Sequence, residues 1–156
     1  MDISWERLNE LISCPKSITP SQKFKFEETY GSRRMNLKLY SEKLDTHYQM
    51  RLRQSLTFGE DFSILLIWNA REVSADITIL RCNGPHGGNR KYKHHFMPHI
   101  HRLNLELAAR NIFKEDVVEL TEEYTTFESA IYHFCSICNI QNAEKYFPEQ
   151  YNVPLF

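Results

Sequence analysis

The sequence predicts an α+β fold, a mostly antiparallel β-meander of about five strands with an N-terminal helix and a C-terminal helix. Two observations carry this prediction. Between residues 23 and 82, apolar and polar side chains alternate in successive short runs, which is the period of a strand with one buried face. Residues 2–12 and 125–138 instead place apolar side chains at helical spacing. The length of 156 residues favours a single domain over residues 1–156.

The first helix is expected over residues 2–12. Asp2 or Ser4 can cap its N-terminus, because both side chains can accept a hydrogen bond from a free backbone N–H group. Pro15 ends it, since proline lacks the N–H group that a helix needs. Its apolar stripe consists of Ile3, Leu8, Leu11 and Ile12.

Five strands are expected next, at residues 23–26, 37–39, 48–53, 62–68 and 77–82. Residues 28–34, with Gly31 and Ser32, indicate a turn between the first two. The third strand alternates strictly, which places one set of side chains in the core and the other on the opposite face. The core set is Tyr48, Met50 and Leu52, and the opposite set is Gln49, Arg51 and Arg53. The apolar run 62–68 indicates a strand buried on both faces.

Residues 83–98 indicate a long loop, with three of the five glycines and two prolines. The following segment is ambiguous, since residues 99–101 favour a strand and residues 103–108 favour a helix. A capping box, Thr125-x-x-Glu128, begins the last helix, and Asn139 ends it. Residues 141–156 are expected to form an extended tail packed on the body.

Composition excludes some classes of protein. The net charge of -1 excludes a wholly basic nucleic-acid coat protein and an acidic disordered tail. No apolar run approaches the roughly 18–20 residues of a membrane helix, and no signal peptide is visible at the N-terminus. We therefore expect a cytoplasmic protein that does not bind membranes. Its four cysteines, including the pair Cys135-x-x-Cys138, are expected to be buried, unreactive thiols.

Charge is unevenly distributed along the chain. Residues 81–110 contain six lysines and arginines against one acid, and residues 33–53 contain six against two. Residues 111–156 contain eight acids against two lysines. This split predicts either a local positive face on a near-neutral protein or basic and acidic segments that pair with each other across the fold.

Five of the seven histidines lie between residues 86 and 101. Histidine titrates near neutral pH, so a pair can supply a general base and a general acid for RNA cleavage without a metal ion. The catalytic candidates are His86 or His99 as base and His101 as acid. The candidate substrate-binding residues are Arg81, Asn83, Arg90 and Arg102, whose polar side chains suit phosphates and bases.

Two other interpretations of this segment stay open. In a strand, His99 and His101 point to the same side and could hold a metal ion, with Glu106, or His86 from the preceding loop, as a third ligand. The basic and aromatic side chains could also bind a partner without chemistry. The favoured function is an RNA-directed protein, a toxin-like ribonuclease that needs no metal or other cofactor. The second is a non-enzymatic module that binds a protein partner as inhibitor or adaptor, and the third is a metal-dependent enzyme.

The segments Gly84-Pro85-His86 and Pro98-His99-Ile100-His101-Arg102 resemble those of a family of small bacterial proteins without an assigned function. The resemblance extends over about residues 10–140. It implies no mechanism, but it picks out His86, His99, His101 and Arg102 within the histidine-rich segment.

Overall fold

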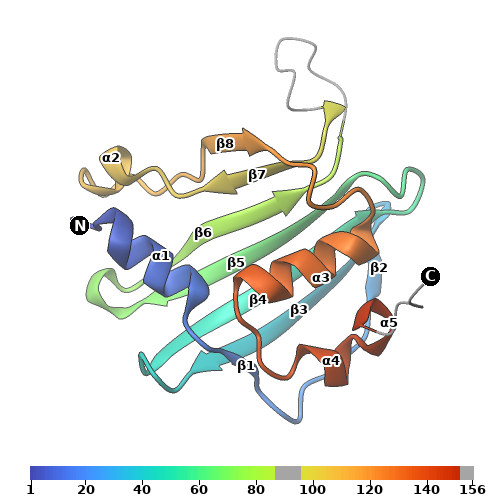
Figure 1. The fold of residues 1–156 in the computed structure, drawn as a ribbon, viewed down its shortest axis with the longest axis horizontal. Coiled ribbons are helices and arrows are strands. Elements are labelled where there is room, and N and C mark those ends of the chain that lie inside the picture. The colour runs from blue at the N-terminus through green and yellow to red at the C-terminus, as the bar shows by residue number, and fades with distance from the viewer. Residues whose placement is uncertain (87–95, 152–156) are drawn as a thin grey trace.

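The computed structural model describes residues 1–86 and 96–151, which form an α+β fold with one antiparallel sheet of eight strands (Figure 1). The strands follow the order β1-β3-β4-β5-β6-β7-β8, and β2 also pairs with β3. Their bounds are Ser17–Ile18 for β1, Glu27–Thr29 for β2, Ser32–Ser41 for β3, Thr46–Ser55 for β4, Phe62–Ala70 for β5, Ala75–Asn83 for β6, His99–Arg102 for β7 and Val117–Leu120 for β8. The fold class is confirmed, but the expectation of about five strands is too low.

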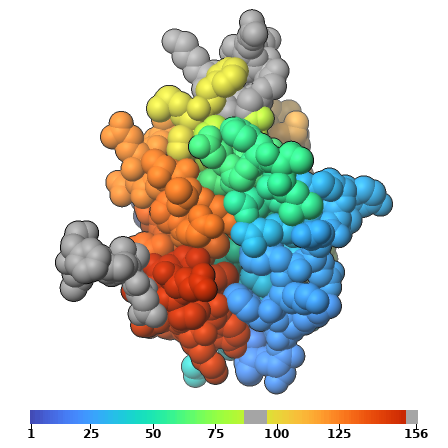
Figure 2. Space-filling model, turned by 90° about the vertical axis from the view of Figure 1, so that its right-hand side faces the viewer, coloured from blue at the N-terminus to red at the C-terminus, as the bar shows by residue number. Residues whose placement is uncertain are grey.

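The additional strands are short and are formed by pairing with distant partners. β7 pairs with β6, β8 pairs with β7, and β1 has only two residues. Residues 23–26, expected as a strand, form none. Phe24 packs its ring 5.2 Å from that of Phe147, and Phe26 packs 6.1 Å from Phe127. Aromatic contacts, rather than a ladder of hydrogen bonds, therefore hold this segment beside the C-terminal helices. Figure 2 shows the blue N-terminal part of the chain next to the red C-terminal part.

The helices begin and end near the expected residues. α1 (Trp5–Ser13) is capped by Ser4, whose hydroxyl accepts from the Arg7 N–H at 3.0 Å. α3 (Phe127–Ile137) is capped by Thr126 rather than Thr125, because Thr126 and Ser129 exchange side-chain-to-backbone bonds. The capping box is thus shifted by one residue, and Glu128 has no part in it. Asn139, with φ of 54°, follows this helix as expected.

Three short helices complete the described chain. α2 (Leu105–Ala108) follows β7, so the ambiguous segment contains a strand and then a helix. α4 (Ala143–Tyr146) and α5 (Pro148–Tyr151) replace the extended tail that was expected from residue 141 onward. A 3-10 turn, Arg71–Val73, links β5 to β6. No helix among residues 1–86 and 96–151 has the length and apolar character needed to span a membrane.

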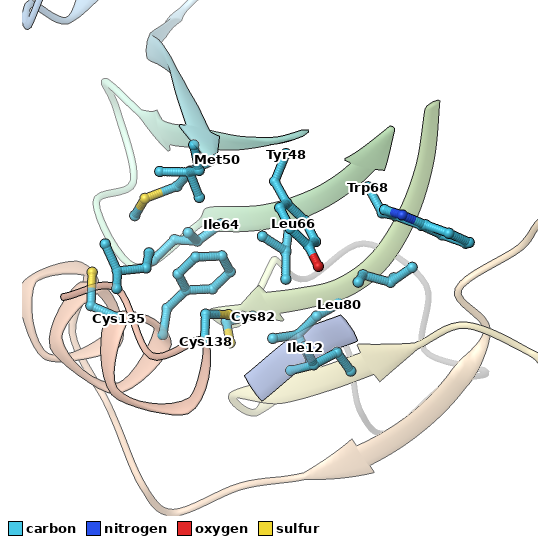
Figure 3. Packing of buried hydrophobic residues seen from close by; sticks show 14 of the residues in the cluster. Ile12, Tyr48, Met50, Ile64, Leu66, Trp68, Leu80, Cys82, Cys135 and Cys138 are labelled. Carbon is cyan, nitrogen blue, oxygen red and sulfur yellow. The ribbon is translucent and has the colours of Figure 1, made fainter. Parts of the chain in front are cut away.

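The core lies between the sheet and the helices α1 and α3, which cover one face (Figures 1 and 3). Tyr48 and Met50 from β4 meet residues of β5, β6 and both helices there. All four cysteines are buried thiols, as expected. Burial raises the pKa of the Cys82 and Cys135 thiols to about 12, which keeps them protonated and unreactive at neutral pH.

The alternation in β4 is confirmed and gives a stability prediction. Met50 is fully buried, whereas Arg51 is exposed on the other face. We expect Met50→Ala to lower the free energy of unfolding by about 2–5 kcal/mol, because it removes a packed side chain and leaves a cavity. Arg51→Ala should change it by no more than about 0.5 kcal/mol. Urea denaturation measures both values, and equal losses would contradict the assignment of faces.

Candidate functional site

The face of the sheet opposite the helices, here called the open face, carries two cross-strand rows of side chains. Strand register places Arg34, Arg53, Ser63, Asn83 and His99 in one row, and Asn36, Arg51, Leu65, Arg81 and His101 in the next. Neighbours in a row lie on adjacent strands, roughly 4.8 Å apart. Arginines on β4 and the histidines on β7 thus share one surface, although the chain separates them by about fifty residues.

The histidine cluster consists of His86, His99 and His101. His99 lies between the other two, with ring centroids 5.1 Å from His86 and 5.0 Å from His101. The Nε2 atoms of His86 and His99 are 3.3 Å apart. The structure therefore brings the three histidines together, and the expectation that the H-x-H pair points to one side is confirmed. His99 is fully buried, His101 is 8 % exposed, and His86 is half-buried.

Backbone carbonyls fix the ring orientation of two histidines. The Nδ1 atom of His99 lies 2.7 Å from the carbonyl oxygen of Met97, and that of His101 lies 2.9 Å from the carbonyl oxygen of Glu115. A carbonyl can only accept, so Nδ1 carries the proton in both rings and Nε2 is the basic nitrogen of the neutral form. Arg81 lies 3.3 Å from Nδ1 of His101, but two donors cannot bond each other, so this is a contact without a hydrogen bond.

Further hydrogen bonds fix His99, the first residue of β7. Asn83 places its Nδ2 atom 3.3 Å from Nε2 of His99, to which it donates. The hydroxyl of Tyr124 donates to the carbonyl oxygens of Asn83 and His99, at 2.8 and 3.0 Å. Burial raises the pKa of Tyr124, so its hydroxyl keeps the proton that it donates. His99 is therefore held by Asn83 of β6 and by Tyr124, which follows β8.

Two buried polar atoms beside the histidines have no hydrogen-bond partner among the residues that the structure describes. They are Nε of Arg81 and Oδ1 of Asn83, whose residue is only 6 % exposed. The Nη1 atom of Arg81 lies 3.4 Å from a carboxylate oxygen of Glu115. A buried donor and a buried acceptor left over at one place are unusual in a folded protein. Each atom has less than 1 Å² of exposed surface, so a bound polar group can reach it only when a side chain moves.

Arg102 does not join this site. It follows His101 in β7, and successive side chains of a strand point to opposite faces. Its row is Leu66, Leu80, Arg102 and Val117, which lies on the helix-covered face. There it pairs with Glu119. The structure therefore does not bring Arg102 together with the histidines, and Arg90 lies outside the described residues.

The basic middle of the chain and its acidic end do pair in part. Arg81 pairs with Glu115 and Arg102 with Glu119, which joins β6 and β7 to the segment around β8. The segment 33–53 behaves differently, because only Arg53 of its bases on the open face has a carboxylate partner within the described chain, Asp61 at 2.6 Å. Both interpretations of the charge split are thus realised, each for a different basic segment.

The metal interpretation requires His99 and His101 with either Glu106 or His86 as the third ligand. Glu106 lies on α2, beyond the end of β7, and is exposed. Within residues 1–86 and 96–151, no three His, Cys, Asp or Glu side chains are arranged to hold a metal ion. The described geometry thus gives this interpretation no ligand set.

Gly84 has a packing role that the sequence did not reveal. A Cβ atom added there would lie 2.1 Å from the carbonyl oxygen of Glu60 and 2.5 Å from the ring of Phe62. The Gly84 N–H also donates to the carbonyl oxygen of Phe62 at 3.0 Å. The absence of a side chain thus lets the chain turn against β5 two residues before His86.

We therefore expect Gly84→Ala to lower the free energy of unfolding by about 1–3 kcal/mol, because the backbone must move to relieve the overlap. Gly59→Ala is the matched control. Its added Cβ would meet only the flexible end of Gln54, at 3.3 Å, so little change is expected. Urea denaturation of the two variants measures the difference, and an equal effect would contradict the close approach at Gly84.

Sequence reasoning missed Arg34 and Lys38 of β3. Both are exposed on the open face, in register with Arg53 and Gln49 of β4. Alternation with Met35, Leu37 and Leu39 contained the signal, but only residues 37–39 were assigned to this strand.

No family model, curated protein or solved structure matches the chain.

Proposed function

We propose that this protein binds RNA on the open face of its sheet and cleaves it with the histidine cluster, without a metal ion. One observation carries the proposal: strand register puts two histidines, an arginine and an asparagine at one end of a surface whose other end is basic, and a third histidine, His86, lies against His99. Arginine and lysine contact phosphates, and imidazoles transfer protons near neutral pH.

Burial suggests a separate role for each histidine. His86 is the half-buried member of the cluster, so it is the proposed general base. His101 is the proposed general acid, because the Glu115 carbonyl holds its Nδ1 and leaves Nε2 as the nitrogen that can carry a transferable proton; the residue is 8 % exposed, so substrate reaches Nε2 only when a neighbouring side chain moves. His99 has no exposed surface and its Nε2 faces that of His86, so it is proposed to orient His86 rather than to touch the substrate. This narrows the earlier choice of His86 or His99 as base.

The proposed reaction uses the 2'-hydroxyl of RNA as its nucleophile. His86 takes the proton of that hydroxyl, and the oxygen forms a bond to the adjacent phosphorus. The bond from phosphorus to the 5'-oxygen breaks, and His101 donates a proton to the departing oxygen. The products are a 2',3'-cyclic phosphate and a free 5'-hydroxyl.

Arg81 is proposed to stabilise the charge on the reacting phosphate. Its guanidinium lies beside His101, and its Nε atom is one of the two leftover polar atoms. Its partner Glu115 is half-buried at 3.4 Å, which is long for a charged hydrogen bond, so a phosphate can compete for the guanidinium. Asn83 can place its Oδ1 atom against a sugar hydroxyl or a base amino group.

Incubation of purified protein with end-labelled single-stranded RNA, with and without EDTA, tests the proposal. We expect cleavage at the same rate in both samples, and products that end in a 2',3'-cyclic phosphate. Replacing the 2'-hydroxyl at the cleavage position by hydrogen should block the reaction, because the nucleophile is gone. Cleavage that stops in EDTA would point to the metal interpretation instead. A folded protein that leaves a total cellular RNA pool intact would contradict the proposal.

A further inference from the structure

The geometry points to single-stranded RNA as the substrate class, anchored on β3 and β4 and cut some distance away at β6 and β7. This inference rests on the proposed function and adds which strands bind the RNA most tightly. The anchor, called the basic patch, consists of Arg34, Lys38 and Arg51 on the open face. Affinity and chemistry are then located on different strands.

The basic patch differs from the other bases of the site in having no acidic partner. Within residues 1–86 and 96–151, none of its three side chains lies within ion-pair distance of a carboxylate. By contrast, Arg53 is paired with Asp61 and Arg81 with Glu115. A cation without an ion-pair partner gains more binding free energy from a phosphate than a cation whose ion pair with a carboxylate must first be broken. The basic patch is therefore the stronger phosphate anchor.

The placement of Arg34 also favours binding over stability. It lies directly across from Arg53 in the antiparallel pair of β3 and β4. Like charges at directly opposed positions destabilise a sheet, and the acid on the other side of Arg34, Glu27 of β2, already pairs with Lys23 at 2.7 Å. A surface hollow of about 460 Å³ adjoins Arg34, and its lining includes Lys23, Lys25, Glu27, Arg34 and Arg51. Four cations against one carboxylate leave the hollow with a positive charge, which suits the phosphates of a nucleic-acid backbone.

The distance from the basic patch to the histidines sets the length of the substrate. β3 and β7 are separated by four strand spacings in the sheet order, or roughly 19 Å at about 4.8 Å each. A stacked strand advances about 3.4 Å per nucleotide, so about six nucleotides span this distance, and fewer when the strand is extended. An RNA that is too short to span this distance can reach either the basic patch or the histidines, but not both.

Single strands fit the surface between these two ends. In the two rows that join the basic patch to the histidines, β5 contributes Ser63 and Leu65, so no charge on this strand interrupts the path. At the other end of β3 and β4, the ring of His47 lies 4.9 Å from that of Tyr40, and planar rings of this kind can stack on unpaired bases. Bases inside a duplex are not available for such contacts.

Fluorescence anisotropy with 2'-O-methyl RNA, which has no nucleophile and cannot be cleaved, tests the inference. Single strands of 2, 4, 6, 8 and 12 nucleotides and a 12-base-pair duplex are the probes. We expect affinity to rise with length up to about six nucleotides and then to level off, and the duplex to bind more weakly than the single strand. Arg34→Ala and Arg51→Ala should each flatten the dependence of log K on log salt by about 0.7, because each removes one phosphate contact.

Arg110→Ala is the matched control, since this exposed arginine follows α2 outside the sheet and should leave the salt dependence unchanged. Binding that is independent of length, tighter binding of the duplex, or an unchanged salt slope in both open-face variants would overturn the inference. In each of these cases RNA is still bound, so the proposed function stands. No binding of any probe would overturn both.

Discussion

His86→Ala should lower the rate of RNA cleavage by about 10²- to 10⁴-fold, which is the usual contribution of one positioned acid or base. His101→Ala should lower it by a similar factor. Binding of uncleavable RNA should change little in either variant, because affinity is assigned to Arg34, Lys38 and Arg51. Single-turnover cleavage assays and anisotropy separate the two effects.

His99→Gln distinguishes positioning from proton transfer. We expect a smaller loss of rate and a shifted pH–rate profile, since His99 contacts Nε2 of His86 and orients that ring. His133→Gln is the control, because this histidine lies on α3, on the helix-covered side of the sheet, and should leave cleavage unchanged. If His86→Ala and His101→Ala cut RNA at the wild-type rate while folded, the cluster has no catalytic role.

Lys16→Met should lower the free energy of unfolding by about 1–3 kcal/mol, the usual cost of leaving a buried hydrogen-bonding group without its partner. Lys16 is 1 % exposed, and its Nζ atom donates to the carbonyl oxygens of Ile12, Cys14 and Cys138. These carbonyls lie at the C-terminal ends of α1 and α3, where the helix dipole favours a cation. Burial lowers the pKa of Lys16, and the neighbouring Cys138 and Cys14 side chains oppose that effect. Methionine keeps the apolar stem but leaves three buried carbonyls without this donor.

Thermal or urea unfolding measures this loss. Lys43→Met, at an exposed position in the turn between β3 and β4, is the control and should change the free energy of unfolding by no more than about 0.5 kcal/mol. A Lys16→Met variant as stable as the wild type would show that the apolar stem alone accounts for the packing of this residue.

The long strands and the two main helices could be predicted because their side chains alternate or recur at one period along the chain. β8 could not be predicted, because most of its four side chains are exposed and it pairs with β7. Lys16 could not be foreseen as buried either, because one of its acceptors, Cys138, lies 122 residues away. Partners so distant leave no local pattern.

The candidate site shows the same division. His99 and His101 are two residues apart in a strand, so their shared side follows from the period of two. The same period places Arg102 on the other face, so the sequence contained the signal that removes it from the site. His86 comes close to His99 because Gly84 packs against β5. Arg51 lies on the same face as the histidines because of the order of the strands in the sheet. Neither is encoded in a motif.

A chemical-shift titration of ¹⁵N-labelled protein with a 2'-O-methyl RNA octamer tests the central claim most directly. We expect the largest changes for residues of β3 to β7 whose side chains form the open face, including Arg51, Arg81 and His101. Amides of α1 and α3, on the opposite side of the sheet, should change little. Changes confined to the helices, or no changes at RNA concentrations that saturate other single-strand-binding proteins, would contradict the claim that the open face is a nucleic-acid surface.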